Sequence, residues 1–162
     1  MMASVSIRRA TPEDAEAILF IYMQSAELHA RLDPDRNHVP ERTEILERYR
    51  SGAQHPEDST ASVTFIAEEA GRVVGFLDAR LTKPFDPMYR PSTYCFIADV
   101  AVAEGQRGRG VGRTLMQAAE QWAAESGAEF VLLEYHVSNE RAAALYAELG
   151  YRAGSVVAVK RL

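Results

Sequence analysis

Hydrophobic positions along the chain follow two periods. Short runs rich in β-branched and aromatic residues predict strands at residues 5–8, 63–69, 72–82, 93–102, 130–137 and 151–160. Apolar residues that recur every three or four positions predict helices at residues 11–31, 41–50, 110–122 and 138–149. A helix between two buried strands is the crossover that a parallel pair requires, whereas the earlier strands follow one another directly. The pattern therefore predicts an α/β (α+β) fold with a mixed, mostly antiparallel sheet.

Turn and cap residues support these boundaries. Thr11 followed by a proline is a strong helix start, with threonine as N-cap and proline in the first turn. The Glu-Ala-Gly turn at residues 69–71 indicates a hairpin. Three prolines within residues 83–91 exclude a central strand or a helix there, and the polar stretch 51–62 indicates a loop. Because there is no internal repeat, low-complexity segment or linker, we expect a single domain over residues 1–162.

Composition and charge narrow the classes of function. Hydrophobic residues make up 47% and charged residues 25%, which is ordinary for a soluble globular domain. The net charge of −5 argues against a nucleic-acid partner held by phosphate contacts, and it mildly favours a cationic amine as substrate. The single cysteine, Cys95, excludes an internal disulfide and is expected in the core, because it lies in an apolar strand.

Membrane and metal sites are not expected. No apolar run reaches membrane-spanning length and the N-terminus lacks a signal-peptide core, so we expect no membrane partner and a cytoplasmic location. His29, His38 and His55 lie in scattered polar surroundings without the spacing of metal ligands. We therefore expect no metal.

A glycine-rich turn links the strand at 93–102 to the following helix. It consists of Arg107, Gly108, Arg109, Gly110, Val111, Gly112 and Arg113. A helix N-terminus offers unpaired N–H donors and partial positive charge, glycine lets the backbone approach a ligand, and arginine adds a permanent cation. The turn lacks the lysine of a Walker loop and the glycine spacing of a dinucleotide loop. It predicts a phosphate ligand of another kind, against the alternative of a solvated basic loop.

A second motif follows the strand at 130–137. Ser138 or Asn139 is the expected N-cap, and the segment continues as Asn139-x-x-Ala142-x-x-Leu145-Tyr146-x-x-x-Gly150-Tyr151. In this order, each preceded by a strand, the two motifs resemble the GNAT superfamily of acyl-CoA-dependent N-acetyltransferases. The resemblance covers the C-terminal part of the chain by motif and the rest by pattern. It implies a twisted sheet of six to seven strands with about four helices, in which the central parallel strands splay around acyl-CoA.

The resemblance also implies roles for individual residues. Acetyl-CoA would bind as co-substrate, with its pyrophosphate on residues 107–113. Its pantetheine arm would lie along the backbone of three residues, Val100, Ala101 and Val102. A backbone N–H near Val102 would polarise the thioester carbonyl. Tyr146, near the sulfur, would be the general acid that protonates the leaving thiolate, and Asn139 would cap its helix, contact the coenzyme or do both.

Several residues compete for the role of general base. Glu134 lies twelve residues before the catalytic tyrosine, at the place where the ribosomal-protein N-terminal acetyltransferases have a basic glutamate. Other GNAT enzymes have a glutamate late in the strand before the phosphate loop, where this chain has Ala98. Asp99 follows, but strand alternation predicts that its side chain points to the opposite face. We select Glu134, acting directly or through water, and keep Asp99, His136 and water alone as alternatives.

The predicted function is N-acetyl transfer from acetyl-CoA to a primary amine, directly and in a ternary complex. The missing glutamate at Ala98 keeps open a non-catalytic acyl-CoA sensor or regulatory module; a plain nucleotide-binding domain is disfavoured by the absent lysine. The resemblance places the acceptor pocket on residues 27–62 and 83–91, which carry no diagnostic pattern. A small-molecule or peptide amine therefore stays open as substrate, as does a homodimer paired through the last strand.

Overall fold

The computed structural model of the chain describes residues 4–53 and 61–162. Its strands and helices follow in chain order as β1 (Ser6–Arg9), α1 (Ala15–Leu32), α2 (Arg42–Ser51), β2 (Ala61–Glu69), β3 (Arg72–Thr82), β4 (Tyr94–Val102), α3 (Val111–Glu125), β5 (Phe130–Leu133) and α4 (Glu140–Glu148). Short 3₁₀ turns at Pro12–Asp14 and Glu104–Gln106 precede α1 and α3. The four predicted helices are confirmed, while residues 54–60 of the predicted loop lie outside the described residues.

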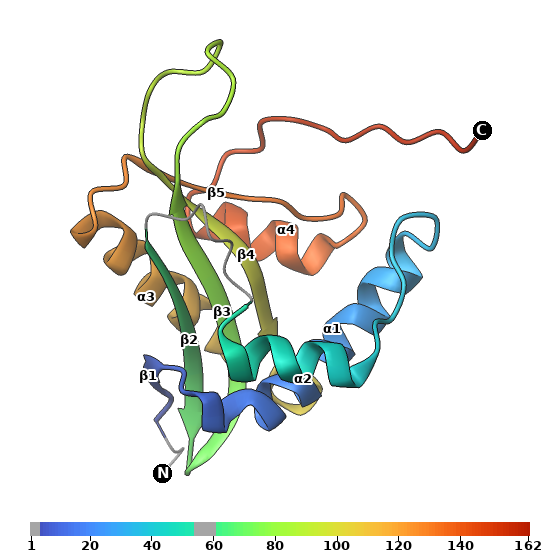
Figure 1. Cartoon of the computed structure of the whole chain (residues 1–162), viewed down its shortest axis with the longest axis vertical. Coiled ribbons are helices and arrows are strands. Elements are labelled where there is room, and N and C mark those ends of the chain that lie inside the picture. Colours follow the sequence, from blue (N-terminus) through green and yellow to red (C-terminus); the bar gives the residue numbers. More distant parts are fainter. Residues whose placement is uncertain (1–3, 54–60) are drawn as a thin grey trace.

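The sheet has the order β1-β2-β3-β4-β5, with antiparallel pairs up to β4 and a parallel pair between β4 and β5. The mixed, mostly antiparallel sheet and the crossover through α3 are thereby confirmed, although the described part of the chain supplies five strands rather than six or seven. Helices α1 and α2 cover one face and α3 the other (Figure 1). Phe76 and Ala101 pack on the α1 side, while Leu77, Ile97 and the buried Cys95 pack on the α3 side.

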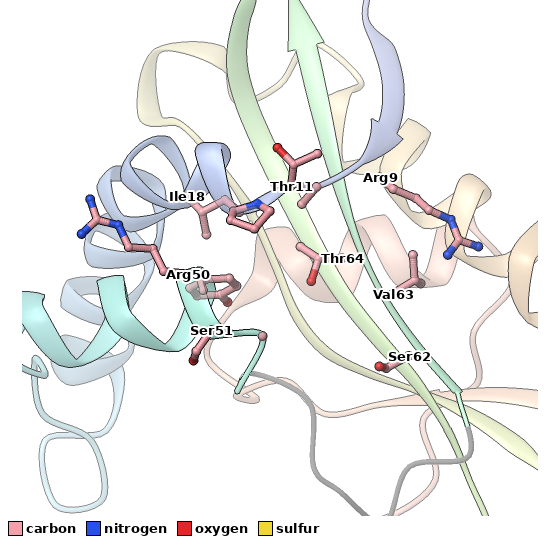
Figure 2. A pocket seen from close by; sticks show the side chains of 12 residues that line it. Arg9, Thr11, Ile18, Arg50, Ser51, Ser62, Val63 and Thr64 are labelled. Carbon is pink, nitrogen blue, oxygen red and sulfur yellow. The ribbon is translucent and has the colours of Figure 1, made fainter.

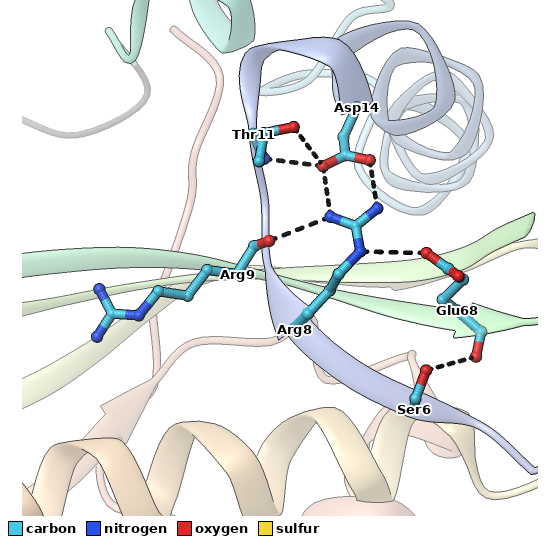
Figure 3. Close-up of polar contacts among 6 residues, drawn as sticks. All are labelled: Ser6, Arg8, Arg9, Thr11, Asp14 and Glu68. Atoms are coloured by element: carbon cyan, nitrogen blue, oxygen red, sulfur yellow. Dashed lines mark hydrogen bonds and ion pairs between the residues drawn. The ribbon is translucent and has the colours of Figure 1, made fainter. Parts of the chain in front are cut away.

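An ion-pair network fixes the start of α1 to the sheet (Figure 3). The Arg8 guanidinium donates two hydrogen bonds of 2.9 Å to the Asp14 carboxylate and one of 3.1 Å from Nε to Glu68. The backbone N–H of Thr11 donates to the same Asp14 carboxylate at 2.8 Å. Hydrogen bonds from Arg8 outweigh burial and lower the pKa of Asp14. The network joins β1, β2 and the entry to α1, and so sets where α1 lies over the sheet.

The strand predicted at residues 151–160 is not formed, and this expectation was wrong. After Gly150 the chain leaves the body as an extended segment without strand structure (Figure 1). Val156 and Val157 are 80% and 61% exposed. β-branched residues favour an extended backbone, but a strand also needs a neighbouring strand that accepts and donates its ladder of hydrogen bonds. Pairing of this segment across a dimer axis stays a prediction.

Close packing around Gly75 holds the start of α3 against the sheet. A Cβ at this position would lie 3.0 Å from the Ala101 carbonyl oxygen. It would also lie 3.1 Å from Leu115 Cδ1 and 3.2 Å from Val111 Cγ1. Val111 opens α3, and Ala101 lies in β4. The absence of a side chain at Gly75 therefore lets the start of α3, with the turn of residues 107–113 before it, lie close to the sheet.

We expect Gly75→Ala to lower the free energy of unfolding by about 1–3 kcal/mol, because the added methyl group overpacks this contact. Urea denaturation measures the change. Gly105→Ala is the matched control, since a Cβ there meets nothing within 4 Å. Two variants of equal stability would contradict the role given to Gly75.

Candidate active site

Strand β4 separates from β5 halfway along its length. In β4, Ile97 pairs with Ala79 and Asp99 pairs with Asp78, so Ala98 is an extra residue between two pairs, a β-bulge. β5 pairs with residues 94–97 only, while β4 continues to Val102. Within the described chain, the β5-facing edge of residues 98–102 therefore has no β5 partner. The splay that was expected between the two parallel strands begins at the bulge.

A cavity of about 510 Å³ lies on the α1 side of this point. Its walls come from α1, the connection after it, α2 and β4, including Tyr22, His29, Arg36, His38, Arg48 and Asp99. A volume of this size suits a small-molecule ligand. Asp99 is the acid that β4 contributes to the cavity wall, and it lies where the sheet opens.

The Ala98 bulge explains why Asp99 is in this cavity. Without the extra residue, Ile97, Asp99 and Ala101 would alternate onto one face. Instead Ile97 packs on the α3 side and Ala101 on the α1 side, because a bulge shifts the alternation by one residue. This corrects the expectation that simple alternation decides where Asp99 points. A bulge at an alanine leaves no clear signal in one sequence.

A buried carboxyl group, that of Asp78, and a partly buried one, that of Asp99, pair in neighbouring strands. Asp78 is 2% exposed and accepts hydrogen bonds of 2.6 Å from both Tyr49 Oη and Thr64 Oγ1. Burial raises the pKa of Asp78 to about 6, against the opposing effect of these hydrogen bonds. Burial, followed by the negative charge of Asp78, raises the pKa of Asp99 to about 7, although the Arg48 cation opposes both. Asp99 can therefore exchange a proton near neutral pH.

Tyr146 lies in α4 as the second motif predicts. It is 7% exposed and packs between the rings of Tyr135 and Tyr151, with centroid distances of 5.4 and 5.8 Å. Burial, followed by the charge of Asp99, raises the pKa of Tyr146 to about 12. The phenol thus keeps its proton at neutral pH and is close enough to Asp99 for the two groups to interact electrostatically.

The turn of residues 107–113 has the conformation that its glycines predict. Gly108 and Gly110 have φ values of 79° and 85°, which glycine adopts without strain, and Gly110 is the N-cap of α3. The first N–H groups of α3 have no acceptor within the helix. The turn therefore presents backbone donors at the mouth of the splay, as an anion site requires.

The arginines of the turn have partners within the protein. Arg109 makes a two-pronged ion pair of 2.9 and 3.1 Å with the buried Glu69, and Arg107 Nε donates to the Val102 carbonyl at 3.0 Å. Arg113 pairs with Glu148. All three arginines are therefore already paired within the protein, and their direct contact with a phosphate stays a prediction. Their contacts hold the turn in place and leave its backbone N–H groups as the main anion donors.

The second motif brings a further cation to the turn. Asn139 Oδ1 accepts from the backbone N–H of Ala142 at 3.2 Å, so Asn139 is confirmed as the N-cap of α4. Arg141, in the first turn of α4, approaches the turn of residues 107–113. A Cβ at Gly108 would lie 3.2 Å from Arg141 Nη2. Sequence reasoning missed Arg141, since only the packing of α4 beside α3 brings the two motifs together.

Glu134 and His136 follow the end of β5 rather than lying within it. The predicted strand at 130–137 ends at Leu133, so both residues belong to the connection before α4. Glu134 is exposed and is not among the residues that line the 510 Å³ cavity. His136 Nδ1 accepts a hydrogen bond of 3.1 Å from the backbone N–H of Ser138.

A second cavity, of about 320 Å³, lies between β2 and the end of α2 (Figure 2). Tyr49 and Thr64, which bind Asp78, line it. Figure 2 shows the side chains of Arg9 and Arg50 extending in different directions, and Arg50 pairs with Glu16 at 2.9 Å. The two arginines therefore do not converge on a common anion.

A model of the acetyltransferase (GNAT) family matches residues 25–151. The chain belongs to this family. YhfO, an uncharacterised N-acetyltransferase of Bacillus subtilis (strain 168), is 28% identical over 147 residues, which cover 91% of this chain and 89% of the relative. The GNAT membership makes this protein an acyltransferase that acetylates an amine.

Solved structures agree with the GNAT fold. A mutant of the BH1408 protein from Bacillus halodurans has a TM-score of 0.85 and 24% identity, over 97% of this chain and 99% of its own. The aminoglycoside N-acetyltransferase AAC(6′)-Iy, solved in complex with CoA, has a TM-score of 0.72 and 20% identity, over 100% of this chain and 97% of its own. At these identities the likeness concerns the fold.

Two negative findings complete the description of this GNAT domain. In residues 4–53 and 61–162, no three His, Cys, Asp or Glu side chains gather in a group that could hold a metal ion. Over the same residues, none of the helices has the length and apolar character to span a bilayer.

The raised pKa of Asp99 leads to a prediction about the stability of the fold. The pKa of Asp99 is raised in the folded protein, so the native state keeps a proton that the unfolded chain loses above about pH 4. The free energy of unfolding therefore falls as the pH rises through about 7. We expect Asp99→Asn to raise the melting temperature by several degrees at pH 8 and to change it little at pH 4. Calorimetry of Glu134→Gln, an exposed acid, is the control, and parallel curves for wild type and Asp99→Asn would contradict the prediction.

Proposed function

We propose that this protein transfers an acetyl group from acetyl-CoA directly to a primary amine in a ternary complex, with Asp99 as general base and Tyr146 as general acid. The observation that carries the proposal is the position of Asp99. It combines a raised pKa, a cavity large enough for an acceptor, and an electrostatic influence on Tyr146, at the point where β4 leaves β5.

Acetyl-CoA fits the separated strands. The edge of residues 98–102 would pair with the pantetheine arm as with an added strand, which leads the thioester from the turn of α3 towards Asp99 and Tyr146. The backbone donors of residues 107–113, together with Arg141, would hold the pyrophosphate. The CoA complex of AAC(6′)-Iy, a protein with the same fold, supports this use of the site.

The protonation states of Asp99 and Tyr146 near neutral pH suit them to the two proton transfers of the reaction. A free alkylamine is almost fully protonated at pH 7, so it needs a base before it can attack the thioester. Asp99, with a pKa of about 7, takes that proton from the ammonium group. A backbone N–H near Val102 stabilises the developing oxyanion. Tyr146, with a pKa of about 12, then donates its proton to the departing thiolate.

Asp99 replaces Glu134 as our first choice of base. Glu134 stays a prediction, but its exposed side chain lies outside the cavity walls. Other GNAT enzymes have a glutamate at the position of Ala98, and Asp99 supplies a carboxylate one residue after it. The main argument for a non-catalytic acyl-CoA-binding module is thereby weakened.

The first test concerns the coenzyme. We expect Arg141→Glu to weaken acetyl-CoA binding about tenfold or more, because it places an anion beside the pyrophosphate turn. Isothermal titration calorimetry measures the affinity. Arg152→Glu makes the same charge change on an exposed residue of the extended tail and should bind normally. Equal affinity in the two variants would remove Arg141 from the coenzyme site.

The second test concerns the base. We expect kcat/KM for the acceptor amine to rise with pH and to level off above about pH 7, as Asp99 loses its proton. Asp99→Asn should abolish this ascending limb and lower kcat by about 10²–10⁴-fold, whereas Glu134→Gln should keep both. The reverse pattern would restore Glu134 as the base. Acetyl-CoA binding without transfer to any amine would instead identify a non-catalytic module.

A further inference from the structure

The cavity that Asp99 lines also has arginine and histidine side chains in its wall. Arg36 and His38, from the connection between α1 and α2, are exposed, whereas Asp99 lies where the sheet opens and is partly buried. His29, on α1, donates from Nδ1 to the Ser25 carbonyl at 2.8 Å, since a carbonyl oxygen only accepts. This leaves Nε2 as the nitrogen that a ligand can meet. The cavity wall thus combines an acid from the sheet with basic residues from the exposed connection.

The acids near these basic residues are engaged by cations. Glu44, the other acid in the cavity wall, accepts from Arg48 at 3.3 Å. Asp33 contacts one nitrogen of Arg36 at 3.7 Å, a long contact that occupies one edge of a guanidinium with five N–H donors. Asp35 pairs with Arg161 of the tail. This part of the cavity therefore offers little uncompensated negative charge to a second or third amino group.

We propose that the acceptor is a primary amine that carries an anionic group, a carboxylate or a phosphate, at its other end. The inference rests on the proposed function, because it takes Asp99 as the base that receives the amine. With the amine at Asp99, the anion meets Arg36 and His38. A guanidinium group binds carboxylates and phosphates through charge-assisted hydrogen bonds, and an imidazole N–H donates a hydrogen bond to the same oxygens.

A polycationic acceptor fits this cavity less well. It would place ammonium groups beside Arg36 and Arg48 without free carboxylates to balance them. The mild preference for a cationic substrate that follows from the net charge of −5 is thereby replaced by a preference set by local charges. Aminoglycosides and polyamines, which are polycations, are therefore expected to be poor substrates.

Matched pairs of amines test the inference in a thiol-release assay with the full chain. β-Alanine is compared with β-alaninamide, and phosphoethanolamine with ethanolamine, so that each pair differs in the anion. Spermidine and kanamycin are the polycations. We expect kcat/KM to be at least about tenfold higher for the anionic member of at least one pair than for its neutral partner and for both polycations. The pair that shows the effect distinguishes carboxylate from phosphate.

Variants connect the preference to the residues. Arg36→Gln combined with His38→Gln should raise KM about tenfold for the anionic amine and leave KM for the neutral amine and kcat for both nearly unchanged. Arg31→Gln removes a charge from an exposed residue outside the cavity wall and is the control. An unchanged preference in the double variant would overturn the inference.

The remaining outcomes separate this inference from the proposed function. Neutral or polycationic amines acetylated as well as anionic ones, with Asp99 still required, would overturn the inference alone. Acetyl-CoA binding without acetylation of any amine in the panel would overturn both.

Discussion

The bulge at Ala98 is the constraint on which the active site depends. It ends the pairing of β4 with β5 and shifts the alternation of β4 by one residue. The first effect leaves a backbone edge for an added strand, and the second turns Asp99 towards α1 and α2. One extra residue thereby underlies both the proposed coenzyme site and the candidate base. The contacts at Gly75 in β3 and the pair of Arg109 with Glu69 in β2 hold α3 and its turn against the neighbouring strands of the sheet.

The candidate base is maintained at a cost in stability. Asp78 and Asp99 face each other in adjacent strands, and burial together with like charge disfavours ionisation of both. The hydrogen bonds from Tyr49 and Thr64 compensate Asp78 directly. Asp99 has no equivalent compensation in its pKa, in which only the Arg48 cation opposes the shift. A group that destabilises the fold at neutral pH and also faces a cavity is a strong candidate for a functional role.

Much of the fold follows from local sequence, and much of the site does not. Helix caps, the hairpin at 69–71 and the glycine turn are encoded by neighbouring residues, so they could be predicted. The tail at 151–160 could not, because strand propensity does not provide a partner strand. The direction of Asp99 depends on a bulge whose residue is an ordinary alanine. Arg141 reaches Gly108 only because α4 packs beside α3, a contact between segments separated in sequence.

The net charge of the protein and the charges in its cavity wall act over different distances. A net charge of −5 acts at long range, where it is screened over about 8–10 Å by physiological salt. Within a cavity of about 510 Å³ the relevant charges are a few ångströms from a ligand, where screening is weak and direction matters. There, Glu44 is paired with Arg48, while Arg36 and His38 share the cavity wall with Asp99. An acidic protein can therefore select an acceptor that is itself partly anionic, because the wall of the cavity rather than the whole surface makes the choice.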